Sequence, residues 1–224
     1  MTDRPVVAAI TIGQTPRPDL LAELAAVLPD GIEVREYGAL DGIAANELPR
    51  IGFTAESPLA TRLADGSQVV VEEAWLSPRV QAAVERAEAD GAGVLVLLCA
   101  GAFDAVTSNA PLIRPATVVS STLGARGFRT ALVVVPSPRQ LVASEAKWRS
   151  LGIDPLMLGV PLPRGLDDVV EAAADVPAVV LDYVGHPARL IDRLEDALES
   201  ETDALLFDLG RYAAFATAEQ VPAS

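Results

Sequence analysis

The sequence predicts an α/β protein with two similar halves, each built on a parallel β-sheet, related by a pseudo-twofold axis and enclosing an active-site cleft. Predicted strands alternate with predicted helices along the chain, which is typical of parallel sheets. An apolar strand followed by Ser- or Thr-Pro-Arg and a helical pattern occurs at residues 7–17 and again at residues 131–139. Two further apolar runs, in LLCAGAF and VLDYVGH, align with LCAG over DYVG, so that Cys99 falls on Tyr183 and Gly101 on Gly185. We interpret these repeats as an internal duplication, with a chance match of short segments as the alternative.

The first half, residues 1–114, is expected to hold one parallel sheet, a β-hairpin and two long helices. Thr15 is expected to cap the first helix, and Pro16 suits its first turn because the missing N–H would be unpaired there. The Asp-Gly pair at 65–66 predicts the hairpin turn. The Ser-Pro pair at 77–78 is expected to cap the second helix. The predicted strands are 5–12, 32–37, 59–63, 68–72, 94–98 and 112–113, and the predicted helices are 19–28 and 77–90.

The second half, residues 115–206, is expected to repeat this plan, and residues 207–224 form a terminal helical segment that can pack back on the first half. One predicted helix carries apolar residues at helical spacing along a single face. They are Leu190, Ile191, Leu194 and Leu198. The predicted strands are 129–135, 153–158, 178–181 and 204–209, and the predicted helices are 116–126, 140–151, 166–174, 188–198 and 211–218.

Composition and charge exclude several classes of function. Half of the 224 residues are apolar, yet no apolar stretch reaches the ~18 residues that a membrane span needs. The net charge of −14 repels phosphate backbones and argues against nucleic-acid binding. Residues 1–5 lack the pattern of a signal peptide, and the single cysteine cannot form an internal disulfide. We therefore expect a cytoplasmic protein that spans no membrane.

The central apolar run, residues 94–98, ends at Cys99. Such a run suits a strand that is buried on both faces of a parallel sheet. Ala100 and Gly101 follow, and residues this small let a ligand approach the backbone. Because ligands of open α/β sheets bind beyond the carboxyl ends of the strands, the thiol lies where this fold class places its chemistry. The alternative is a core cysteine that behaves as a small hydrophobe.

Four loops should meet at the cleft and bind a small carboxylate. Two of them precede helices, whose N-terminal N–H groups favour anions, and each contributes an arginine able to bind a carboxylate through two hydrogen bonds. The alternative is that Thr-Pro and Ser-Pro are ordinary capping pairs and that both arginines are solvated. The candidate binding residues are Gly13, Gln14, Thr15, Arg17, Ala100, Gly101, Ser137, Arg139, Gly185 and His186.

The remaining polar candidates are weaker. His186 is the only histidine, so a site with two histidine ligands cannot be built and we expect no metal. This histidine either caps a helix or lines the wall of the cleft, and a pair with Cys99 requires that their loops meet. Glu72 and Glu73 are adjacent, so on one strand they would point to opposite faces and form a poor acid–base pair. The common nucleotide-binding and nucleophile-elbow motifs are absent from the sequence.

The segments TIGQTPRPD, CAGAF and VVLDYVGHP together resemble the AroM family, over nearly the whole chain. AroM proteins in turn resemble the aspartate/glutamate/hydantoin racemase superfamily. That resemblance implies two α/β halves, no cofactor, and one cysteine from each half that exchanges a proton at the substrate α-carbon. The first cysteine position matches Cys99, whereas the second falls on Tyr183. Two-thiol racemization is therefore in doubt, and decarboxylation, isomerization or a lyase step is easier with one thiol.

These observations lead us to expect a cofactor-independent isomerase or lyase that acts on an amino acid, a hydantoin or a malonate-like carboxylate. Cys99 would serve as acid–base or nucleophile, and Tyr183 would support it from the opposite wall. The rival hypothesis is a non-catalytic protein that binds a small anion or regulates another process. A purely structural protein is the third, and a homodimer is the default expectation for assembly.

Overall fold

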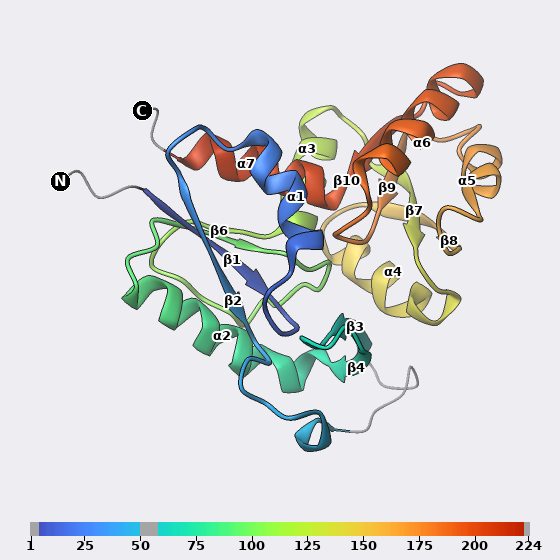
Figure 1. The fold of residues 1–224 in the computed structure, drawn as a ribbon. Coiled ribbons are helices and arrows are strands. Elements are labelled where there is room, and N and C mark those ends of the chain that lie inside the picture. The colour runs from blue at the N-terminus through green and yellow to red at the C-terminus, as the bar shows by residue number, and fades with distance from the viewer. Residues whose placement is uncertain (1–4, 50–57, 222–224) are drawn as a thin grey trace. The chain divides into compact units, whose positions relative to one another are not determined.

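The computed structural model describes residues 5–49 and 58–221 (Figure 1). Residues 1–4, 50–57 and 222–224 lie outside the described residues, including most of the segment inspected for a signal peptide. The chain forms two compact units: Met1–Arg114 together with Ala213–Ser224, and Pro115–Tyr212.

Unit 1 contains a four-stranded sheet in which every pair is parallel, in the order β2-β1-β5-β6. All residues of the two central strands are buried, as their continuous apolar runs predict. Helix α2 packs on β1 and β2. The strands are β1 (Val6–Thr11), β2 (Glu33–Gly38), β5 (Val94–Leu97) and β6 (Leu112–Ile113), and the helices are α1 (Pro18–Val27), η1 (Ala45–Glu47) and α2 (Glu73–Ala89).

A separate antiparallel hairpin joins β3 (Pro58–Arg62) to β4 (Gln68–Glu72), so the prediction from the Asp-Gly pair is confirmed. The hairpin packs against the loop that follows β1. The backbone N–H of Gln14 donates to the carbonyl of Arg62 at 3.0 Å. A Cβ on Gly13 would lie 2.4 Å from that carbonyl oxygen, so only glycine permits this close approach.

Unit 2 contains a second four-stranded parallel sheet, in the order β10-β9-β7-β8. Helix α4 packs on β8, and α6 packs on β10 and α5. The four apolar residues predicted to share one face of α6 are all buried. The strands are β7 (Thr130–Val135), β8 (Asp154–Gly159), β9 (Ala178–Leu181) and β10 (Leu205–Asp208), and the helices are α3 (Pro115–Ala125), η2 (Pro138–Gln140), α4 (Leu141–Ser150), α5 (Leu166–Ala172), α6 (Ala188–Glu201) and α7 (Leu209–Gln220), whose later part belongs to unit 1.

The two sheets have the same topology. In each unit the first strand lies between the second and the third, and the fourth is at the far edge beside the third. The ladder ends also correspond: Leu98 donates its N–H to the carbonyl of Ile10, and Asp182 donates its N–H to the carbonyl of Val134. Cys99 and Tyr183 therefore follow equivalent ladder positions. This agreement supports the duplication inferred from the repeated segments.

Two predicted helix caps are wrong. Helix α1 begins at Pro18 with Arg17 at the N-cap and no side-chain cap, so neither Thr15 nor Pro16 starts it. Helix α2 begins directly after β4, which places Pro78 inside it. The Ser-Pro pair was misleading because the apolar stripe of α2 already starts at Leu76, one residue before it. Packing of that stripe outweighs the cost of one proline inside the helix.

Candidate functional site

Cys99 lies two residues after β5, beyond the carboxyl end of a central strand of the unit 1 sheet. The residue is buried, with 8% of its surface exposed. The backbone N–H of Gly101 donates to its Sγ at 3.3 Å. An N–H group aimed at sulfur stabilises negative charge there more than it stabilises a neutral thiol. The turn therefore suits a thiol that gives up and regains a proton.

The loop after Cys99 is held by a glutamate that sequence reasoning set aside. Glu73 is the first residue of α2, and its Oε1 accepts the backbone N–H of Phe103 at 2.9 Å. Phe103 is fully buried and has a φ of 47°, in the left-handed region. A bulky residue in that region costs on the order of 1–3 kcal/mol, so the hydrogen bond and the burial must hold it there. Glu72 ends β4, so the two glutamates do not share a strand.

Gln14 fastens the loop after β1 to its surroundings. Its amide nitrogen donates to the carbonyls of Leu40 at 3.0 Å and Ile43 at 2.7 Å. Its amide oxygen accepts the N–H of Ala64 at 2.8 Å. These bonds give the Gln14 side chain a structural role in joining three segments.

Thr15 is fastened in a similar way to Asp41. The Thr15 N–H donates to Asp41 Oδ1 at 2.8 Å, and its hydroxyl lies 3.1 Å from Oδ2. The same carboxylate accepts the N–H of Gly38 at 2.8 Å. Asp41 therefore joins the loop after β1 to the end of β2, a role that could not be seen in the sequence.

Arg17 has an internal partner. Its guanidinium donates two hydrogen bonds to Asp19, from Nε at 2.9 Å and from Nη2 at 2.8 Å. These bonds lower the pKa of the Asp19 carboxyl below its ordinary value, and Arg62 adds a second cation 3.6 Å away. Only 10% of the Arg17 side chain is exposed, against 51% for Arg62. In this structure Arg62, which sequence reasoning did not single out, is the more exposed cation beside the loop.

In unit 2 the Ser137 Oγ accepts the N–H of Arg139 at 3.3 Å at the start of η2, which is the capping arrangement given as the alternative to a binding role. Arg139 itself is exposed. The short η2 leads into α4, so the second Pro-Arg segment starts a helical region where the first instead forms a loop before Pro18.

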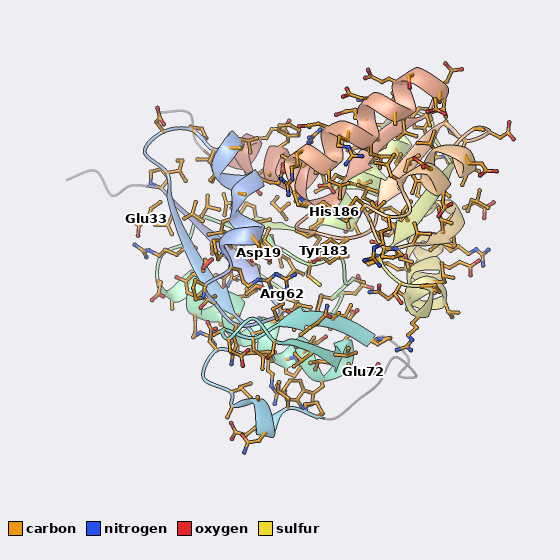
Figure 2. The ribbon with its side chains drawn as sticks, turned by 45° about the vertical axis from the view of Figure 1, so that its right-hand side comes forward. Asp19, Glu33, Arg62, Glu72, Tyr183 and His186 are labelled. Atoms are coloured by element: carbon orange, nitrogen blue, oxygen red, sulfur yellow. The ribbon has the colours of Figure 1, made fainter. Side chains whose placement is uncertain are left out.

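Tyr183 and His186 lie together after β9 (Figure 2). Their ring centroids are 4.9 Å apart with an interplanar angle of 53°. Gly185 between them has a φ of 103°, which L side chains rarely adopt. Burial lowers the pKa of His186 from 6.5 to about 4, so its ring is neutral at pH 7. The N-cap of α6 is Pro187 and has no side-chain cap, so the proposed capping role of His186 is wrong.

Asp182, just before Tyr183, makes the most buried ion pair of the described residues. Lys147 Nζ lies 2.5 Å from its Oδ1, and the Ser144 hydroxyl donates to its Oδ2. Exposed fractions are 3% for the Asp182 side chain and 11% for that of Lys147. Sequence reasoning missed this cluster, although one signal was visible: Lys147 is the only lysine among 17 lysine and arginine residues.

Within each unit the candidate residues gather at the carboxyl ends of the two central strands. β1 pairs with β5, so residues 13–17 and Cys99 with Gly101 follow neighbouring strands. β7 pairs with β9, so Ser137 and the Tyr183–His186 turn do the same. Among the described residues, no group of three or more His, Cys, Asp or Glu side chains could hold a metal ion. Within residues 5–49 and 58–221, no helix is long and apolar enough to cross a membrane.

Solved structures share this two-unit α/β fold. An arylmalonate decarboxylase is similar with a TM-score of 0.66 and 15% identity, covering 98% of this chain and 94% of that one. Allantoin racemase from Klebsiella pneumoniae is similar with a TM-score of 0.62 and 16% identity, covering 96% and 86%. The maleate isomerase Iso from Pseudomonas putida S16 is similar with a TM-score of 0.60 and 13% identity, covering 95% and 90%. The fold is thus that of the Asp/Glu racemase-like proteins.

The family can be named more narrowly. The sequence pattern of the AroM family, described as AroM protein, matches residues 7–203. The chain therefore belongs to the AroM family, as its TIGQTPRPD segment suggested. No curated protein matches the chain.

Proposed function

We propose that this protein is a cofactor-independent isomerase or lyase acting on a small carboxylate that is an amino acid, a hydantoin or malonate-like. The observation that carries the proposal is the position of Cys99: it lies two residues beyond the end of a central strand, and its sulfur accepts the N–H of Gly101. Proteins of similar fold include a decarboxylase, a racemase and an isomerase by name. We assign Tyr183 a supporting role in this chemistry.

A single thiol favours chemistry on one face of the substrate. In a malonate-like substrate the bond between the α-carbon and one carboxylate breaks, carbon dioxide leaves, and the electron pair remains on the α-carbon. The Cys99 thiol then donates its proton to that carbon, and the thiolate regains a proton from water. Racemization needs a base on each face, and an unperturbed tyrosine hydroxyl, with a pKa of about 10, is a weak base at neutral pH.

The test is turnover of a panel of amino acids, hydantoins and malonates in D₂O. NMR would follow deuterium incorporation at the α-carbon, and carbon dioxide release would be measured in parallel. We expect Cys99→Ala to lower turnover by about 10²–10⁴-fold, the usual contribution of a general acid or base. Tyr183→Phe tests the supporting role of the tyrosine hydroxyl, and thermal shift with the same compounds reports binding.

The second candidate is a small-anion binding or regulatory protein, favoured by the exposed Arg62 guanidinium beside the loop after β1. Binding of a panel member without exchange or carbon dioxide release would support it over the enzyme. Full turnover by Cys99→Ala would remove the thiol from the mechanism.

A further inference from the structure

The buried ion pair between Lys147 and Asp182 is not required by the fold. The ladder position of Asp182 corresponds to Leu98 in unit 1, because each donates its N–H to a carbonyl of the first strand of its sheet. Leu98 is buried and apolar, with 7% exposure. A parallel sheet of this topology therefore accepts leucine at the position where unit 2 places a charged group.

A buried charge at this position carries a cost. Removing a carboxylate and an ammonium from water costs several kcal/mol for each ion, and their attraction offsets this only with good geometry and further hydrogen bonds. Asp182 has both: Lys147 contacts one oxygen and the Ser144 hydroxyl donates to the other. Ser144 and Lys147 are three residues apart on α4, so they share one face of the helix.

The cluster fixes the residue from which the Tyr183 turn begins. The Asp182 backbone is held by β7 through a 2.9 Å hydrogen bond, and its side chain is held by α4. In the turn that follows, the centroids of the Tyr183 and His186 rings lie 4.9 Å apart. A side chain anchored at one end of a short turn limits the positions available to the groups that follow it.

We propose that Lys147 and Asp182 are positioning residues that hold the Tyr183–His186 turn in place. The inference rests on the proposed function in one respect, since it gives that turn a role in the carboxylate site. The sole lysine of the chain thus acts through Asp182 rather than on the substrate. Arginine is the more common cation in buried ion pairs, whereas here the compact ammonium of Lys147 makes the contact with Asp182.

His186 allows a direct test because it is the only histidine. In protein with isotope-labelled histidine and tyrosine, the His186 ring protons give one set of signals and a nuclear Overhauser effect to Tyr183. We expect Lys147→Met to shift these signals and to weaken the effect, and Lys147→Arg to restore both in large part. The matched control is Arg149→Met, which breaks the exposed pair with Glu145 on the same helix and should change neither.

Ser144→Ala provides a milder second variant, because it removes one anchor and leaves the Asp182 charge paired. It should shift the same signals in the same direction by a smaller amount. If both Ser144→Ala and a folded Lys147→Met lower the melting temperature while the His186 signals stay in place, the pair is merely structural and the inference is overturned.

These readouts need no substrate, so they stand apart from any failure of the proposed function. Where a panel compound is turned over, Lys147→Met should lower kcat more than it raises KM. An unchanged kcat beside a displaced Tyr183 would overturn the catalytic importance of the turn and leave the role of Cys99 intact.

Discussion

Substitution of Gly13 by alanine should destabilise the protein strongly, because there is no room for a methyl group. The new Cβ would lie 2.4 Å from the carbonyl oxygen of Arg62 and 2.5 Å from Thr61 Oγ1. Overpacking of this kind costs about 1–3 kcal/mol. Displacing the hairpin also strains the 3.0 Å bond from Gln14 to Arg62, and a hydrogen bond contributes about 1 kcal/mol. We expect a loss of about 3 kcal/mol, equivalent to about 6–12 °C in Tm for a chain of this size.

Urea unfolding followed by circular dichroism would measure this loss. Gly93→Ala is the matched control in the same unit. The residue is exposed, and the added Cβ would lie 4.0 Å from the Val6 carbonyl oxygen, which is ordinary contact distance. That control should be neutral, or more stable by up to about 1 kcal/mol through a less flexible unfolded chain. If the free energy of unfolding of Gly13→Ala lies within about 0.5 kcal/mol of the wild-type value, the close approach of the loop and the hairpin is refuted.

Three further predictions concern groups around the two sheet edges. Asp41→Ala should lower the free energy of unfolding by about 1–3 kcal/mol, since it leaves the N–H of Thr15 without its acceptor, and an unchanged urea midpoint would contradict this. Because the pKa of folded His186 is about 4, the unfolded chain binds a proton first as the pH falls. Stability should thus fall between about pH 6.5 and pH 4, by at most about 3 kcal/mol, and His186→Phe should lose that part of the dependence. Glu73→Ala should speed alkylation of Cys99 about fivefold through easier local opening, and an equal or slower rate would count against this role of the glutamate.

The elements of the fold were largely predictable because hydrophobic period and turn residues are local signals. The strand 178–181 and the buried face of α6 were predicted as they occur. The predictions failed for two helix caps. A Thr-Pro or Ser-Pro pair looks the same in the sequence whether it lies in a loop, inside a helix or at a cap. Which of these applies at Pro78 depends on the packing of Leu76, a tertiary effect.

The sequence predicted which residues follow the strand ends of the candidate site, but it did not predict the hydrogen-bond partners of their side chains. Cys99 and Tyr183 could be aligned because each follows an apolar run, and the equivalent ladder bonds agree with that alignment. The partners of Gln14 lie 26 to 50 residues away in the sequence, and a glutamine in a loop carries no sign of them. Asp182 and Lys147 are 35 residues apart, and only the scarcity of lysine pointed to the second of them.

The division of the chain has a consequence for its synthesis. Unit 2 is one continuous stretch, whereas unit 1 draws on Met1–Arg114 and on Ala213–Ser224. On the ribosome, every residue of the second unit is made before the segment that completes the first. Unit 2 can therefore fold while unit 1 still lacks its last segment, so the second unit has the chance to form first although it is synthesised later.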